Sequence, residues 1–185
     1  RGTAYMWYYL YRPAGRRPCP ELALTKEEIR RVRRFLVDAR VRKPIVLVDS
    51  YWDADGNGLC PAATGISHHI NPWGDIEPCP PIQFAAENIA DGDIETLLLG
   101  SDFLDTFRRR TADTTRGCIL LENPAALKEI VASARDTSHR HVGTAELDIL
   151  LPCPSHHDEN DPIPESHWLY RFAKKHWFFG FGTYG

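Results

Sequence analysis

Cysteines in turn-rich segments are the residues of this sequence best suited to chemistry. Cys60 and Cys79 are separated by residues 61–78, and each is followed by proline. Cys118 comes directly after the loop-like stretch TTRG, and Cys153 lies between two prolines. Buried structural cysteines usually sit inside strands or helices as small hydrophobic residues. Thiolates held on short turns are instead typical ligands of zinc and of iron–sulfur clusters, so we treat these cysteines as candidate metal ligands.

The sequence as a whole favours such chemistry over a disulfide framework. The chain has five cysteines, an odd number, of which Cys19 is the fifth. Its first residues lack the basic, then apolar, then small-residue layout of a signal peptide. We therefore expect a cytoplasmic protein in which disulfides are disfavoured and metal or redox chemistry gains weight.

Charge and hydropathy exclude two classes of partner. The net charge is −3 and the isoelectric point about 6.2. This balance gives no general attraction to nucleic acid or to anionic lipid. No apolar run is long enough to span a bilayer. We expect neither a nucleic-acid partner nor a membrane.

Zinc is one metal that these cysteines suit, but only with dispersed ligands. The sequence contains no C-x2-C pair, so it fits no zinc-finger spacing. His68 or His69 could join such a site. Neighbouring residues on a strand point to opposite faces, so one of the two histidines at most would easily reach the same metal.

The N-terminal part that must support these cysteines has the pattern of a parallel α/β unit. Ala4–Pro13 is aromatic and predicts a strand, and Pro44–Asp49 is a short apolar run typical of a strand buried on both faces. Between them, Thr25 and Glu28 form a capping box at the start of a helix with apolar residues at helical spacing. Strand, helix and strand indicate a parallel pair at the end of a larger α/β sheet or barrel. We expect the earlier part of that barrel to be missing from this chain and an apolar sheet edge or face to be exposed.

The middle of the chain predicts short elements joined by turns. Asn71–Gly74 reads NPWG, a type I turn signature that folds SHHI against DIEP as a small hairpin. This hairpin would bring together the arms that carry Cys60 and Cys79. Two short helices broken at Gly100–Ser101 follow, and Asn123–Pro124 starts a helix predicted to run to about Arg135.

The C-terminal part predicts a loop and then an aromatic tail. Residues 151–164 are rich in proline and acid, without apolar rhythm, and are typical of a loop. A helix is predicted from about Glu165, followed by a glycine-rich and aromatic end. Trp168, Leu169, Phe172 and His176 recur at helical spacing, and Trp177, Phe178, Phe179 and Phe181 follow. We expect this aromatic face to pack against the core, with Lys174 on the opposite, basic side. The alternatives are docking on a partner or on the missing half, or contact with a membrane surface.

The order Cys60, Gly74, four residues, Cys79 resembles the C-terminal auxiliary domain of radical S-adenosylmethionine enzymes, of the SPASM or the shorter twitch type. The hairpin between the two cysteines is similar to the small hairpin of that family. The helical segment after it, and Cys118 beyond, also fall where the family places them. The resemblance covers about Ala4–Cys118. It implies an α/β fold: the βαβ end of a partial (β/α) barrel in residues 1–50, and a small α+β auxiliary-cluster domain of a short hairpin and helices in residues 51–150. Residues 151–185 then form the acidic loop and the aromatic tail.

The resemblance implies one [4Fe–4S] cluster on Cys60, Cys79 and Cys118. The fourth ligand would be Cys153, Cys19 or a histidine, or an iron would stay open to substrate. The full auxiliary pattern carries a close-spaced group of cysteines where only Cys118 stands here, so a second cluster is excluded by count.

The C-x3-C-x2-C motif that binds the S-adenosylmethionine-cleaving cluster of the family is absent. S-adenosylmethionine would therefore enter only through a missing N-terminal radical portion, in the same or another chain. The expected role is that of an oxidoreductase portion whose cluster relays an electron or binds a peptide or small-molecule substrate. The alternatives are a zinc-stabilised or a metal-free α/β binding module without catalytic activity.

Overall fold

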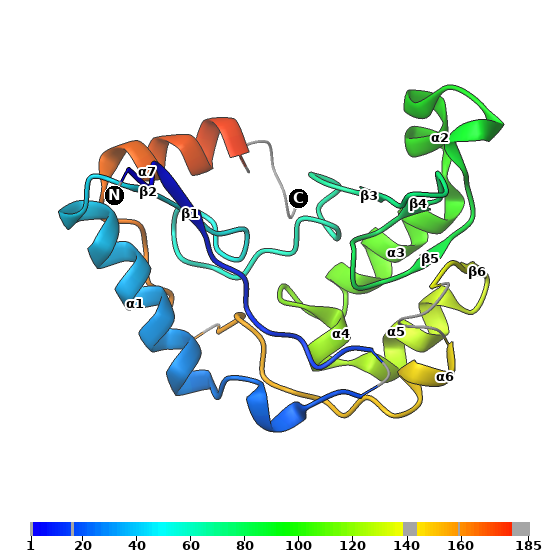
Figure 1. The fold of residues 1–185 in the computed structure, drawn as a ribbon, viewed down its shortest axis with the longest axis horizontal. Coiled ribbons are helices and arrows are strands. Elements are labelled where there is room, and N and C mark those ends of the chain that lie inside the picture. The colour runs from blue at the N-terminus through cyan, green and yellow to red at the C-terminus, as the bar shows by residue number, and fades with distance from the viewer. Residues whose placement is uncertain (1, 16, 139–143, 159, 179–185) are drawn as a thin grey trace.

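The computed structural model describes residues 2–15, 17–138, 144–158 and 160–178. It contains both helices and short strands, so the mixed α and β class is confirmed. Two hydrophobic clusters form the interior. One is built around Leu36, Leu47 and Trp52, and the larger one around Phe84, Phe107 and Leu127. In Figure 1 the long helix α1 and helix α7 lie on one side, and α3, α4 and α5 lie on the other.

The N-terminal part forms the predicted strand–helix–strand unit. Strand β1 (Tyr5–Trp7) pairs in parallel with β2 (Val46–Val48), and helix α1 (Lys26–Arg42) joins them. Thr25 and Glu28 form both hydrogen bonds of the capping box, as their spacing predicts. The first strand is shorter than Ala4–Pro13, because only three of its residues find a partner in β2.

The outer surface of this parallel pair carries exposed apolar residues. Tyr5 is 65% exposed, Trp7 50% and Val46 52%. Parallel strands are usually covered on both faces by other elements. The described residues therefore leave apolar sheet surface open at the place where the sequence predicts further strands.

A cluster of buried charges joins this unit to the C-terminal part. Arg33 and Arg40 of α1, which the apolar periodicity of the helix does not predict to be buried, are 1% and 3% exposed. Arg33 Nη1 lies 2.8 Å from Glu165 Oε1, and Arg40 contacts both Asp49 and Glu165. Lys174 Nζ lies 3.1 Å from Asp49 Oδ1 and 3.1 Å from Glu165 Oε1. Burial alone would raise the pKa of Asp49, but the charges of Lys174, Arg40 and Arg33 outweigh it and hold that pKa well below its usual range.

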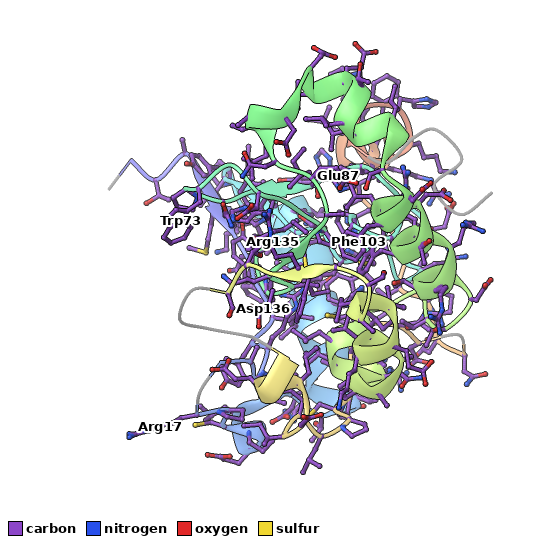
Figure 2. All side chains as sticks on the ribbon, turned by 90° about the vertical axis from the view of Figure 1, so that its right-hand side faces the viewer. Arg17, Trp73, Glu87, Phe103, Arg135 and Asp136 are labelled. Carbon is purple, nitrogen blue, oxygen red and sulfur yellow. The ribbon has the colours of Figure 1, made fainter. Side chains whose placement is uncertain are left out.

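The hairpin predicted around Asn71–Gly74 is present. Strand β3 (His69–Ile70) pairs antiparallel with β4 (Ile76–Glu77). The Gly74 N–H donates to the carbonyl of Asn71 at 3.0 Å, closing the turn. Trp73 in this turn is 60% exposed and stands out at the edge of the face shown in Figure 2.

Helices α2 (Ile94–Gly100) and α3 (Asp102–Ala112) break where the sequence predicts, at Ser101, whose side chain caps α3. Phe103, Leu104 and Phe107 of α3 are buried. Beyond α3 lie the short helix α4 (Ile119–Glu122), helix α5 (Pro124–Val131) and the short helix α6 (Thr144–Leu147).

The prediction that the helix after Pro124 continues to about Arg135 is wrong. Helix α5 ends at Val131, and Arg135–Asp136 form strand β6, which pairs with β5 (Phe84–Ala85). Two contacts with the β3–β4 hairpin stabilise this pairing. The Thr137 hydroxyl donates to Glu77 Oε1 at 2.6 Å, and Arg135 forms an ion pair with Asp75. These long-range contacts outweigh the local helical preference.

The expectation for the aromatic tail is also wrong for its described residues. Helix α7 (Trp168–Ala173) continues as a π-helical turn, Lys174–Phe178. Trp168 is 73% exposed and Trp177 68%, whereas Lys174 is buried in the charge cluster. Phe179 and Phe181, which belong to the aromatic end of the sequence, lie outside the described residues. Within the described residues, no helix is both long and apolar enough to cross a membrane.

The hairpin turn gives a direct test of the fold. Gly74 has a φ of +88°, and a Cβ built on it would lie 2.8 Å from Asn88 Oδ1. We expect Gly74→Ala to lower the free energy of unfolding by about 1–3 kcal/mol, because an L side chain is strained at this φ and also crowds Asn88. The measurement is urea or thermal denaturation followed by circular dichroism.

Gly100→Ala is the matched control. Gly100 lies at the end of α2 with open space around its Cβ position and no positive φ, so this change should leave stability the same or slightly higher. Equal losses for the two variants would contradict the turn geometry.

Candidate functional site

Cys60, Cys79 and Cys118 line one cavity of about 370 Å³, although they lie far apart in the sequence. Cys118 is buried, and the other two are partly exposed. Arg12, Tyr51 and three histidines also line this cavity. The structure thus brings together the three cysteines for which the sequence predicts a shared site.

Cys60 is placed by a turn that begins at its own carbonyl group. The Thr64 N–H donates to the Cys60 carbonyl at 3.0 Å, and the turn continues to Ile66. The sulfur of Cys60 accepts hydrogen bonds from the backbone N–H groups of Ala62 and Ala63. Amides aimed at a sulfur stabilise its thiolate form and are common around metal-bound cysteines.

Cys79 lies two residues after the end of β4, at a tight turn made by the two prolines that follow it. The Ile82 N–H donates to the Cys79 carbonyl at 2.9 Å and also bonds to the Cys79 sulfur. Because prolines have no N–H and a fixed φ, this turn is rigid and leaves the amide of Ile82 to face the sulfur. The hairpin β3–β4 therefore delivers Cys79 to the cavity in a defined position.

Cys118 is the N-cap residue of α4, and its carbonyl accepts from Leu121 N and Glu122 N. Its own N–H donates to Ser155 Oγ at 3.3 Å. This bond holds the loop around Ser155 against the start of α4. Gly117 is required here, since a Cβ at this position would lie 2.1 Å from Ser155 Oγ.

Arg12 is the positive charge of the cavity. Its Nε donates to the Cys118 sulfur at 3.3 Å, and its Nη1 donates to the Tyr51 hydroxyl at 3.3 Å. Burial alone would lower the pKa of Arg12, but the neighbouring Cys118 and Tyr51 outweigh it, and the pKa is raised. The guanidinium is thus a fixed cation that would balance negative charge on the sulfurs.

Burial raises the pKa of the Cys60 thiol to about 11, and the nearby Cys118 adds to this effect. Burial likewise raises the pKa of Cys79, with Cys60 and Cys118 contributing. Without a bound cation, Cys60 and Cys79 are therefore held as neutral thiols at physiological pH. A metal that binds them must displace these protons.

Cys19 and Cys153, which the sequence analysis names as possible fourth ligands, do not line this cavity. Cys153 packs against the larger hydrophobic cluster, and its N–H donates to the Leu121 carbonyl at 2.7 Å. The Cys19 N–H bonds to the Tyr11 hydroxyl at 3.3 Å.

Three histidines line the cavity: His68, His69 and His156. His68 and His69 belong to the doubled pair that the sequence analysis considers. His156 was missed, because it lies in the proline-rich acidic segment that the sequence predicts only as a loop. Its position depends on contacts with Tyr51, Trp52 and Leu59, for which the sequence carries no signal.

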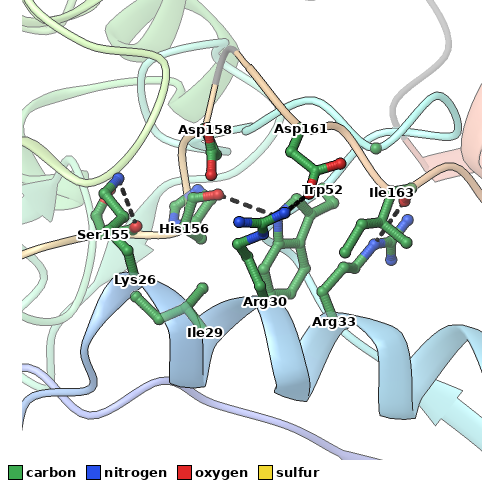
Figure 3. Close-up of a pocket in the computed structure, with 11 residues that line it drawn as sticks. Lys26, Ile29, Arg30, Arg33, Trp52, Ser155, His156, Asp158, Asp161 and Ile163 are labelled. Carbon is green, nitrogen blue, oxygen red and sulfur yellow. Dashed lines mark hydrogen bonds and ion pairs between the residues drawn. The ribbon is translucent and has the colours of Figure 1, made fainter.

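The segment that carries His156 is fastened to helix α1 (Figure 3). Lys26 donates to the Ser155 carbonyl at 3.1 Å, and Arg33 Nε donates to the Ile163 carbonyl at 3.0 Å. Trp52 Nε1 donates to the His156 carbonyl at 3.1 Å. The small cavity between this segment and α1, about 10 Å³, has room for one water-sized sphere.

A second cavity, of about 310 Å³, adjoins the one lined by cysteines. Trp7, Ser50, Pro61 and Ser67 line both. The shared wall includes strand β1, whose outer surface is exposed.

Among the described residues, no group of three or more His, Cys, Asp and Glu side chains is arranged to hold a single metal ion. No family model, no curated protein and no solved structure matches the chain.

The raised thiol pKa can be tested on metal-free protein. At pH 8 the thiolate fraction of Cys60 should be about 100-fold lower than that of an ordinary thiol, because its pKa lies about two units higher. Alkylation of Cys60 by iodoacetamide should therefore be slow at pH 8 and accelerate as the pH rises through about 11. Site-resolved mass spectrometry gives the rate, with Cys153 in the same sample as the reference. Equal rates for the two at pH 8 would contradict the described environment.

Proposed function

We propose that this chain is the auxiliary-cluster portion of a radical S-adenosylmethionine-type oxidoreductase, with Cys60, Cys79 and Cys118 holding one [4Fe–4S] cluster. The observation that carries the proposal is the convergence of these three cysteines, each at a turn or helix start, on one cavity. The order of Cys60, Gly74 and Cys79 around the hairpin supports the family.

The chemistry of the donor set fits an iron–sulfur cluster. Three soft sulfur ligands come from three separate backbone segments, and backbone N–H groups face two of the sulfurs. A cluster needs far more space than one ion, and the cavity of about 370 Å³ offers it. The proposal does not rest on a preformed site for a single ion, since the cluster spaces its sulfur ligands more widely.

Arg12 would compensate the negative charge that the thiolates bring. A cluster with cysteine ligands is anionic, and an anion in a partly buried site is costly unless it is paired. The guanidinium already donates to the Cys118 sulfur. Hydrogen bonds to cluster sulfurs and nearby cations both raise the reduction potential, so Arg12 would make the site easier to reduce.

The exposed apolar surface of β1 and β2 supports the arrangement that the family implies, in which a radical portion outside this chain packs beside it. The residues that would cleave S-adenosylmethionine are not in this chain. A neighbouring radical portion would complete the parallel sheet beside β1, where Tyr5 and Trp7 are exposed. Its substrate would then lie along the wall shared by the two cavities. When bound, the cluster would supply an electron-transfer or substrate-binding centre.

Anaerobic reconstitution of the full chain with ferrous iron and sulfide tests the proposal. We expect about four iron and four sulfide per chain, with the broad visible absorption of a [4Fe–4S] cluster. Cys60→Ala, Cys79→Ala and Cys118→Ala should each lose most of the bound iron, because each removes one terminal thiolate.

Cys19→Ala and Cys153→Ala are the matched controls, and both should keep wild-type iron content. Stoichiometric zinc without sulfide would replace the proposal with a zinc-stabilised binding module. Absence of both metals after reconstitution would replace it with a metal-free α/β module.

A further inference from the structure

The cavity is lined by one cysteine fewer than the number of terminal positions in the proposed cluster. A [4Fe–4S] cluster usually takes four protein ligands, and the cavity offers three cysteines. The fourth ligand must therefore come from another residue that lines the cavity, or be absent.

His156 is the histidine most firmly held at the cavity wall. It is only 4% exposed. Its ring lies 5.0 Å from that of Tyr51 and 5.8 Å from that of Trp52, between centroids. These two aromatic side chains confine the imidazole to one plane.

A backbone carbonyl fixes the tautomer of His156. Nε2 lies 2.9 Å from the Leu59 carbonyl oxygen, which can only accept, so Nε2 carries the proton. Nδ1 then keeps its lone pair. Burial lowers the pKa of His156 to about 3, so the ring is neutral. A neutral imidazole that donates its other N–H to a backbone carbonyl is the usual arrangement of a metal-binding histidine.

Two separate chains of contacts hold His156 beside Cys118. The first runs through its neighbour Ser155, whose hydroxyl accepts from the Cys118 N–H at 3.3 Å. The second runs through Tyr51, which contacts the His156 ring and accepts from Arg12, the residue that donates to the Cys118 sulfur. His156 therefore shares its surroundings with a proposed cluster ligand.

The other two histidines of the cavity are less suitable. His68 is half-buried, and its Nδ1 has no hydrogen-bond partner among the described residues, so no hydrogen bond at that atom orients its ring. His69 faces the buried carboxylate of Glu77, with Nε2 3.8 Å from Oε2. Within the part of the chain that the structure describes, no backbone carbonyl orients either ring in the way that Leu59 orients His156.

We propose that His156 is the fourth ligand of the cluster, through Nδ1, so that the site is three cysteines and one histidine. This inference rests on the proposed function. It replaces Cys153, which lies outside the cavity, as the candidate for that position.

Pulsed EPR on reconstituted, reduced protein labelled with ¹⁵N-histidine tests the assignment. The wild type should show a ¹⁵N hyperfine coupling of the size expected for nitrogen bound directly to cluster iron. His156→Cys should keep the iron content of the wild type and lose this coupling, because a thiolate takes the place of the imidazole. His156→Ala should also lose the nitrogen coupling. If His156 had only a structural role, its nitrogen would give no such coupling in the wild type.

His68→Gln and His69→Gln serve as controls, and both should keep the coupling. A wild-type cluster without nitrogen coupling would overturn the inference and leave the proposed function intact. Coupling that persists in His156→Cys would assign the ligand to another histidine and overturn it as well. Failure of the wild type to bind iron and sulfide would overturn both.

Discussion

The buried cluster of Arg33, Arg40, Asp49, Glu165 and Lys174 is the interaction on which the arrangement of this chain depends. It joins the face of α1, the end of β2 and the C-terminal segment, which are distant in the sequence. Removal of one partner from such a cluster typically costs about 3–5 kcal/mol, because it leaves a charge buried without compensation. The cluster fixes Glu165, and the bonds from Lys26 to the Ser155 carbonyl and from Trp52 to the His156 carbonyl hold the part of the chain that places His156 at the cavity.

The second constraint is the charge balance of the cavity itself. Burial disfavours the thiolate forms of Cys60 and Cys79. The positive charge of Arg12 opposes this effect of burial. A bound cationic cluster core would invert the preference, since metal coordination deprotonates thiols. With neutral thiols at Cys60 and Cys79, Arg12 leaves the empty cavity positive, and thiolates formed on metal binding would balance this charge under the proposed function.

Much of the local structure could be predicted from the sequence, because short-range rules determine it. The capping box at Thr25, the turn at Asn71–Gly74 and the break at Ser101 each depend on a few neighbouring residues. The meeting of Cys60 with Cys79 followed from the hairpin between them. The features that escaped prediction depend on distant partners. Residues Arg135–Asp136 leave the helical pattern to pair with β5, and Lys174 turns inward because Asp49 and Glu165 lie there. His156 had no signal, since its role depends on rings and a carbonyl supplied by residues 51–59.

The central claim is that three cysteines from separate segments hold a polynuclear iron–sulfur cluster. X-ray absorption at the iron edge of the anaerobically reconstituted full chain tests this claim most directly. The account predicts an iron–sulfur shell together with an iron–iron scattering path, because the irons of a cluster are bridged by sulfide. Iron surrounded only by oxygen and nitrogen, without an iron–iron path, would contradict it.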